Sequence, residues 1–314
     1  MDKKALRIVY MGTPDFAVES LKALVNGGYH VVGVVTMPDK PAGRGQKIQY
    51  SAIKDYALQA NLPLLQPEKL KDPGFLSALQ AWDADLQIVV AFRMLPEVVW
   101  DMPRLGTFNL HASLLPQYRG AAPINWAIIN GEKETGVTTF FLTHEIDTGK
   151  IIFQEKVTIE EIDTAGTLHD KLMYLGAKLV TKTVDALLAG QCNATAQEDL
   201  IANVALKNAP KIFKETCQID WNRSPQEIHN FVRGLNPYPG AWAEMKMPNG
   251  EVLVFKIFET EPLQSSSSAP IGQVETDGKT RLTVSASGGC VRLLTIQQAG
   301  KRRMSAEEFL RGYR

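Results

Sequence analysis

The chain has 314 residues, of which 45% are hydrophobic and 22% are charged, a composition typical of soluble globular proteins and a length sufficient for two domains. Its three cysteines are widely spaced, which disfavours disulfides and zinc sites and favours a reducing compartment. No run of about 18 apolar residues occurs, and the amino terminus lacks the apolar segment of a signal peptide, so we expect a cytoplasmic protein that is not associated with membranes. We also expect a monomer.

The formal net charge is zero, but the charge is unevenly distributed along the chain. Residues 1–206 hold 19 Lys and Arg against 23 Asp and Glu, whereas residues 207–314 hold 15 against 11. A zero overall charge by itself argues against a nucleic-acid partner. A basic carboxyl-terminal part on an acidic body nevertheless fits the binding of a polyanion by that part. Chance asymmetry is the competing explanation.

The first hundred residues alternate between apolar runs and segments with helical spacing. We predict strands at 6–11, 30–35, 63–65 and 86–91, and helices at 16–24, 50–60 and 75–82. Strands that are apolar throughout are typical of parallel sheets buried on both faces, so the predicted fold class is α/β, a Rossmann-like, doubly wound and mostly parallel sheet. Its first turn offers only Gly12 where a dinucleotide fingerprint needs three glycines, which makes a nicotinamide-dependent dehydrogenase a weak alternative.

Residues 37–47 interrupt this alternation with glycines, prolines and three cationic side chains. The segment is too rich in glycine and proline for a regular element and too basic for a simple connection, so we predict a functional loop. A solvated connecting loop is the alternative on composition alone.

Polar side chains gather at the ends of two predicted strands in the middle of the chain. Asn109 and His111 are two residues apart at the end of a strand that begins at residue 107, so their side chains point to the same face. Pro116, which cannot donate a ladder hydrogen bond, indicates that a loop has begun. The next strand, 136–142, is followed by His144, Glu145 and Asp147. One carboxylate and one imidazole can therefore meet at this edge of the sheet.

Each of these residues has an ordinary structural explanation when taken alone. A single His in a loop is commonly a surface or packed residue, and an Asp before Thr-Gly is common turn chemistry. Together, Asn109, His111 and Asp147 form a set suited to acyl transfer: an amide that can donate to an oxyanion, an imidazole, and a carboxylate to orient it.

The run from Asn109 to Gly120, NLHASLLPQYRG, resembles the signature of the folate-dependent formyltransferases, and Asp147-Thr-Gly149 resembles their second catalytic element. The continuation APINWAI at 122–128 is similar to the members that act on methionyl-tRNA, and the resemblance extends over nearly the whole chain. It implies transfer of a formyl group from 10-formyltetrahydrofolate, without a metal, to the amino group of methionine on initiator methionyl-tRNA. A sugar-nucleotide amine or glycinamide ribonucleotide as acceptor is the nearest alternative, and a noncatalytic RNA-binding protein is a more distant one.

The resemblance also implies roles for individual residues. Asn109, His111 and Asp147 would be catalytic, while Arg44 and Lys47, in the basic loop, would contact the acceptor arm of the tRNA. The folate would be held by two loops, through Phe92, Arg93, Leu95, Ser113, Leu114, Leu115 and Pro116. Family members usually carry Tyr-Gly where this chain has Phe92-Arg93, so the first of the two loops departs from the family pattern.

The remaining sequence predicts a change of architecture. A strand at 151–159 and a long amphipathic helix at 167–188 complete a catalytic domain, 1–190, and a polar linker without periodicity follows at 191–210. A capping box, Ser224 to Glu227, precedes a helix at 228–233. Short strands are then predicted at 241–247, 251–260, 271–276, 281–286 and 291–297. The last domain, 211–314, is therefore expected to be a small oligonucleotide-binding-type (OB-like) β-barrel, whose family role is nonspecific tRNA contact.

Overall fold

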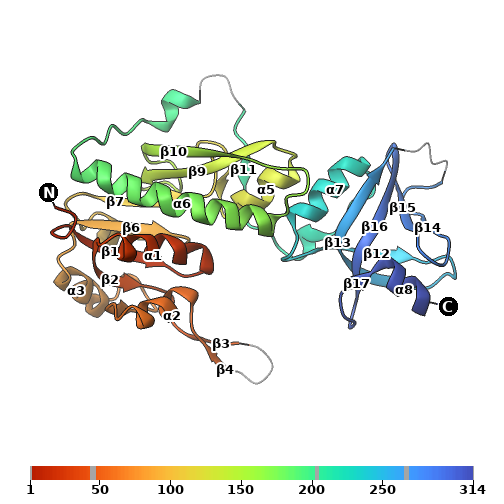
Figure 1. Cartoon of the computed structure of the whole chain (residues 1–314), viewed down its shortest axis with the longest axis horizontal. Helices are drawn as coiled ribbons and strands as arrows, with labels where there is room; N and C mark the ends of the chain where they lie inside the picture. The colour runs from red at the N-terminus through yellow and green to blue at the C-terminus, as the bar shows by residue number, and fades with distance from the viewer. Residues whose placement is uncertain (1, 43–46, 202–204, 265–268, 314) are drawn as a thin grey trace. The chain divides into compact units, whose positions relative to one another are not determined.

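The computed structural model describes residues 2–42, 47–201, 205–264 and 269–313 (Figure 1). The chain forms two compact units. The first unit contains Met1–Gly120, Thr135–Val157 and His169–Asn208, and the second unit contains Ala121–Glu134, Thr158–Leu168 and Ala209–Arg314. Within the described ranges, no helix is long and apolar enough to cross a membrane.

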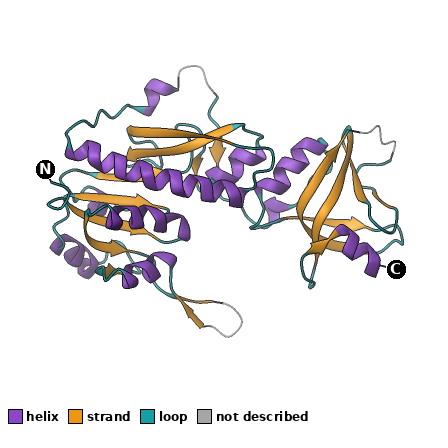
Figure 2. Ribbon diagram, in the orientation of Figure 1, coloured by secondary structure: helices purple, strands orange, loops and turns teal. Residues whose placement is uncertain are grey.

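The first unit is built on a seven-stranded sheet with helices packed on it (Figure 2). In sequence order the strands are β1 (Arg7–Gly12), β2 (His30–Val35), β5 (Leu64–Leu65), β6 (Leu86–Val90), β7 (Thr107–His111), β9 (Glu134–Phe141) and β10 (Ile151–Thr158). The α-helices are α1 (Val18–Asn26), α2 (Ala52–Gln59), α3 (Pro73–Ala81), α4 (Glu97–Trp100) and α6 (Ala165–Leu188), whose first turn belongs to the second unit. Two short 3-10 helices are η1 (Asp15–Ala17) and η2 (Gln197–Leu200).

The order of strands across the sheet explains where a site can form. The order is β10-β9-β7-β6-β1-β2-β5, and the pairs from β7 to β5 are parallel, while β9 runs antiparallel to β7. All five residues of β6 are buried, Gln87 included, as expected for a mostly apolar strand covered on both faces. The chain runs outward from β1 to β2 and β5 and then returns to β6 on the other side of β1. This reversal is a topological switch point, and the loops after β6 and β7 leave the sheet beside it. The predicted Rossmann-like sheet is confirmed.

The basic loop predicted at 37–47 contains more regular structure than expected. Two short strands, β3 (Lys40–Ala42) and β4 (Lys47–Gln49), pair antiparallel, with Pro41 opposite Ile48. The prediction that no regular element forms here is therefore wrong at both ends of the loop, because backbone pairing in a hairpin does not depend on an apolar period in the side chains. Arg44 lies outside the described residues.

The second unit combines three helices with an antiparallel sheet. The helices are α5 (Pro123–Ile129), α7 (Pro225–Gly234) and α8 (Ala306–Gly312), with the 3-10 helix η3 (Glu215–Cys217). The strands are β12 (Ala241–Lys246), β13 (Val252–Leu263), β14 (Val274–Thr276), β15 (Leu282–Ala286), β16 (Gly289–Gln298) and β17 (Met304–Ser305). A separate pair of two-residue strands, β8 (Arg119–Gly120) and β11 (Asn208–Ala209), belongs to the first unit except for Ala209.

The sheet of the second unit curls around its own hydrophobic core as a half-barrel. Its order is β12-β13-β16-β15-β14, with β17 beside β16, and the core includes Phe255, Leu282 and Val291, all of them fully buried. Phe309 of α8 packs edge-to-face on Phe255 with ring centroids 5.1 Å apart, which covers one part of this core. The predicted capping box is also confirmed, because Ser224 and Glu227 exchange hydrogen bonds at the start of α7. A small β domain was therefore predictable from the density of short strands.

Candidate active site

His111 is the last residue of β7 and is almost fully buried, with its side chain 8% exposed. Its Nε2 lies 2.9 Å from the backbone carbonyl oxygen of Tyr118. A carbonyl oxygen can only accept a hydrogen bond, so Nε2 carries the proton in the neutral ring and Nδ1 keeps a free lone pair. The loop after β7 thereby fixes the tautomer of the imidazole and leaves Nδ1 as the nitrogen able to take up a proton.

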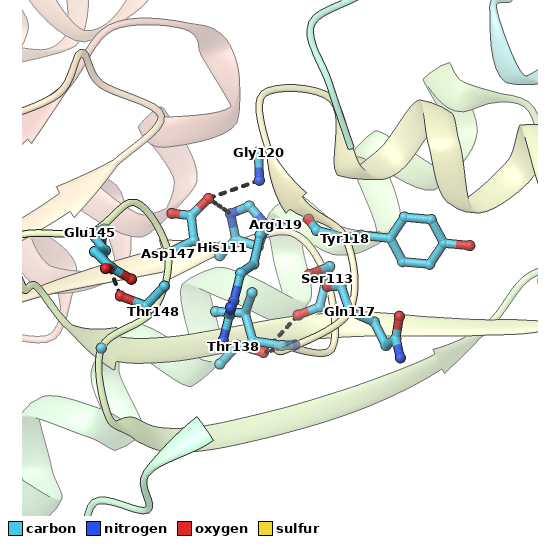
Figure 3. A network of polar contacts seen from close by, with 12 residues as sticks. His111, Ser113, Gln117, Tyr118, Arg119, Gly120, Thr138, Glu145, Asp147 and Thr148 are labelled. Atoms are coloured by element: carbon cyan, nitrogen blue, oxygen red, sulfur yellow. Dashed lines mark hydrogen bonds and ion pairs between the residues drawn. The ribbon is translucent and has the colours of Figure 1, made fainter. Parts of the chain in front are cut away.

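Asp147 faces that nitrogen from the loop between β9 and β10 (Figure 3). Its Oδ2 lies 3.8 Å from Nδ1 of His111, and its side chain is 11% exposed. The same oxygen accepts a hydrogen bond of 3.0 Å from the backbone N–H of Gly120. The structure thus brings together the imidazole and the carboxylate from two strand ends that are 36 residues apart in the sequence.

The Asp-Thr-Gly sequence has a backbone explanation as well as a chemical one. Asp147 has a φ of +56°, in the left-handed region that Asp and Asn tolerate better than most residues. Gly149 lies directly against β9, where an added Cβ would lie 1.6 Å from the carbonyl oxygen of Phe141. No side chain fits there, so the glycine allows the loop to turn back tightly and hold Asp147 over the sheet.

Asn109 lies on the same strand as His111, with alternate side chains of β7 facing the same side. Its Oδ1 is buried and has no hydrogen-bond partner among the described residues. A buried amide oxygen without a partner costs free energy, and such groups are concentrated where a ligand completes the hydrogen bonding. Rotation of the amide by half a turn presents its N–H groups in the same place, so Asn109 can either accept or donate.

The loop after β7 is held by hydrogen bonds of its own. Ser113 is fully buried, and its hydroxyl donates to the carbonyl of Gln117 at 2.7 Å, while its carbonyl accepts from Thr138 at 2.6 Å (Figure 3). Leu115 is 2% exposed, and Leu114 and Pro116 are partly buried. Ser113 and Leu115 therefore shape the turn.

The loop after β6 has its side chains turned toward the protein in the same way. Leu95 is buried, and Phe92 packs against the same core. The guanidinium of Arg93 donates to the carbonyl oxygens of Pro67 and Glu68, the latter at 2.8 Å. Partial burial lowers the pKa of Arg93 from its ordinary value, although an arginine remains charged. Arg93 thus ties this loop to the segment after β5.

His144, which the sequence places beside this set, lies apart from it. His144 is 72% exposed and approaches Glu97 at 3.4 Å, so it belongs to the outer side of the loop. Lys47 is the first residue of β4, and Arg44 is outside the described ranges. Among the described residues, no three His, Cys, Asp or Glu side chains are grouped as metal ligands.

Sequence reasoning did not find four contributors to this site. The carbonyl of Tyr118 and the N–H of Gly120 are backbone groups, which no side-chain pattern reveals. Arg119 and Gln197 form hydrogen bonds with each other, and Gln197 also contacts the Asp147 loop. Arg119 stands inside the run that carries the family resemblance, and this was the only available signal.

Comparison with known proteins places this geometry in a family. Two family models match the chain, "Formyl transferase" over residues 6–184 and "Formyl transferase, C-terminal domain" over residues 211–314. The methionyl-tRNA formyltransferase of Bacteroides thetaiotaomicron is 63% identical over 314 residues, covering 100% of this chain and 98% of the relative. That of Flavobacterium johnsoniae is 54% identical, covering 98% and 96%.

Solved structures share the fold at lower identity. HypX from Aquifex aeolicus in complex with tetrahydrofolic acid has a TM-score of 0.63 and 16% identity over 97% of this chain. This chain spans about half of HypX, covering 47% of its length. The N-formyltransferase from Helicobacter canadensis, in complex with folinic acid and dTDP-3-aminofucose, has a TM-score of 0.64 and 20% identity, covering 93% of this chain and 99% of that one. Because both family models match and the relatives are similar over their full length, the chain belongs to the formyltransferase family.

Proposed function

We propose that this chain transfers the formyl group of 10-formyltetrahydrofolate to the α-amino group of methionine carried by initiator methionyl-tRNA. The curated relatives with this named activity are 48% to 63% identical over essentially the full chain. The observation that carries the chemistry is the imidazole of His111, whose Nε2 is engaged by a carbonyl and whose Nδ1 faces the carboxylate of Asp147 at 3.8 Å.

The reaction forms a bond between the methionine nitrogen and the formyl carbon and breaks the bond from that carbon to N10 of the folate. When bound, the folate supplies an activated carbonyl. The amine attacks through its lone pair, and its nitrogen must give up a proton as the new bond forms; Nδ1 of His111 has the lone pair available to accept that proton. Asp147 then stabilises the positively charged imidazole, and the proton is passed on to the leaving nitrogen. His111 therefore ends the reaction in the protonation state in which it began, having moved one proton from the methionine nitrogen to N10.

Asn109 supports the same reaction from the strand. The formyl oxygen becomes negatively charged in the tetrahedral intermediate and requires a hydrogen-bond donor. The buried amide of Asn109, whose oxygen has no partner among the described residues, can rotate to present an N–H group to it. Loss of one such donor typically lowers the rate by about 10²- to 10³-fold.

The two loops proposed to hold the folate follow β6 and β7. Phe92, Arg93 and Leu95 turn their side chains toward the protein, and Ser113 and Leu115 do the same in the second loop. The main chain of the second loop is itself engaged within the protein, because the N–H of Leu115 donates to Thr138 and the carbonyls of Ser113 and Leu115 accept from Thr138 and Gln154. Both loops nevertheless lie at the carboxyl ends of β6 and β7, where ligands typically bind in α/β sheets. We therefore propose that Phe92, Arg93, Leu95 and residues 113–116 form the folate site through the shape that they give to these two loops.

The second unit carries a surface suited to RNA. A groove of about 1010 Å³ is lined by three lysines, Lys211, Lys214 and Lys256, against two acidic residues, Glu215 and Glu244. Two aromatic side chains in its lining are well exposed, Phe213 at 53% and Tyr238 at 81%. Cations beside exposed aromatic rings favour phosphates and unstacked bases. Arg44 and Lys47 of the basic loop are proposed to contact the acceptor arm.

An acceptor panel tests this function. The full chain is incubated with 10-formyltetrahydrofolate and, separately, with methionyl-tRNA, free methionine and an amino-sugar nucleotide, and formylated product is measured. The proposal predicts formylation of methionyl-tRNA at a rate far above that of the other acceptors. Preferential formylation of the sugar nucleotide would replace the proposal with the activity named for the Helicobacter canadensis structure.

A further inference from the structure

Gln197 is the first residue of η2, in the segment that follows α6, and it is fully buried. Its Oε1 accepts two hydrogen bonds from Arg119, from Nε at 3.0 Å and from Nη2 at 2.6 Å. Its Nε2 donates to the carbonyl oxygens of Asp147 and Gly149, both at 2.8 Å. An amide has two N–H donors and two acceptor lone pairs, so this side chain uses its full hydrogen-bonding capacity.

The partners of Gln197 belong to the two loops that hold the catalytic pair. Arg119 follows Tyr118, whose carbonyl fixes the ring of His111. The other two partners lie on either side of Thr148, in the loop that presents the carboxylate of Asp147. One side chain, 50 residues from Asp147 and 78 from Arg119 in sequence, therefore connects both loops.

The backbone of the segment after Gln197 also contacts the loop that follows β7. The side chain of Gln117 donates to the carbonyl of Ala205 at 3.1 Å and accepts from the N–H of Lys207 at 2.8 Å. The N–H of Tyr118 donates to the carbonyl of Lys207 at 2.6 Å. Residues 197–201 and 205–207 thus lie along the catalytic loops of the first unit, although their composition predicts only a polar linker.

The Asp147 loop needs such an anchor. Asp147 has a left-handed backbone conformation, which is strained and persists only where the surroundings hold it. The carbonyls of Asp147 and Gly149 are hydrogen-bond acceptors that require donors when buried. The planar amide of Gln197 supplies both donors in one fixed geometry, so the position of the carboxylate depends on it.

We propose that Gln197 is a positioning residue for formyl transfer, which sets the place of the Asp147 carboxylate relative to His111 by holding the carbonyls of residues 147 and 149. This inference rests on the proposed formyltransferase chemistry and concerns the same site. Gln197 touches no substrate; it acts through Asp147.

The sharpest substitution is Gln197→Glu, which keeps an oxygen acceptor for Arg119 and removes both N–H donors to the Asp147 loop. An error of about 1 Å in a catalytic group can lower a rate by roughly 10²-fold. We therefore expect the single-turnover rate to fall by about 10- to 100-fold, with the Michaelis constants of both substrates little changed. Gln197→Met, of similar length and without a charge, should show the same fall if the carboxylate variant folds poorly.

Gln191→Glu is the matched control, because Gln191 is exposed in the same segment and the chemical change is identical. It should leave the rate and the melting temperature unchanged. A wild-type rate for both Gln197 variants, or a defect confined to the Michaelis constants, would overturn the proposal.

A double-mutant cycle with Asp147→Asn separates positioning from general loss of stability. If Gln197 acts through the carboxylate, Gln197→Glu should add less than about twofold to the defect of Asp147→Asn. Multiplication of the two defects would show that Gln197 acts elsewhere and would overturn the proposal. The cycle uses the amine acceptor that the unsubstituted chain formylates best, so the wrong choice of acceptor counts against the proposed function and not against Gln197.

Discussion

Asp147 Oδ2 lies 3.8 Å from Nδ1 of His111, while the hydrogen bond that the same oxygen accepts comes from the backbone of Gly120. This separation exceeds that of a direct hydrogen bond. The protein therefore holds the carboxylate of Asp147 near the imidazole while the lone pair of His111 Nδ1 stays available. This arrangement leaves the base free for a proton from the substrate amine, and places a negative charge where the protonated ring would need it.

Asp147→Asn tests the charge separately from the shape. Asparagine can adopt the left-handed backbone of this position and can still accept from Gly120, so the fold should be retained. The chemical step should nevertheless slow by about 10²-fold or more, because the protonated imidazole loses its counter-charge. Single-turnover rates with saturating substrates measure this directly. A defect seen only in substrate affinity would mean that Asp147 shapes the turn and takes no part in the chemical step.

Gly149→Ala tests the tight packing under the catalytic loop. The new methyl group would meet the carbonyl oxygen of Phe141, so the loop must move and the free energy of unfolding should fall by roughly 1–3 kcal/mol. Activity should fall with it. Gly312→Ala is the control, since a Cβ there meets nothing within 4 Å. Chemical denaturation of both variants gives the comparison, and equal stabilities would contradict the close packing.

Arg93→Lys tests whether the loop after β6 is held by the planar fork of the guanidinium. A lysine cannot reproduce two parallel hydrogen bonds to the carbonyls of Pro67 and Glu68, so the loop should shift. The Michaelis constant for 10-formyltetrahydrofolate should rise by several-fold, and that for methionyl-tRNA should stay the same. Arg104→Lys is the control, because the side chain of Arg104 is exposed and forms an ion pair with Asp85. Equal changes in both constants would remove Arg93 from the folate site.

The three lysines that line the groove of the second unit predict that tRNA affinity depends on salt concentration. Replacing Lys211, Lys214 and Lys256 by Ala should weaken tRNA binding and reduce the slope of log affinity against log salt by about one for each lost phosphate contact. Lys279→Ala, outside the groove lining, is the control. Binding titrations at several salt concentrations provide the slopes, and an unchanged slope in the triple variant would mean that the groove does not bind phosphates.

Much of the fold was predictable because local patterns and burial agree. Strands such as β2 and β6 are mostly apolar runs, and the structure buries all of their residues except His30. The period of two placed Asn109 and His111 on one face, and the capping box of Ser224 marked the start of α7. Short elements were missed: α5 and α8 have seven residues each, too few for a helical period to stand out.

The support of the site could not be predicted for a different reason. Gln197 stands in a polar segment, and nothing near it in sequence indicates that its amide meets Arg119 and two backbone carbonyls. Contacts of this kind depend on the tertiary fold, which brings distant segments together. The backbone groups of Tyr118 and Gly120 likewise have no signature in the sequence, although they fix the ring of His111 and the carboxylate of Asp147.

The most direct measurement follows a labelled formyl group from 10-formyltetrahydrofolate to methionyl-tRNA with the unsubstituted chain and with His111→Ala. We predict that label appears on the methionine amine with the unsubstituted chain, and at least about 10²-fold more slowly with His111→Ala, while tRNA affinity is preserved. Absence of transfer by the unsubstituted chain, or a His111→Ala rate above one tenth of its value, would contradict the account.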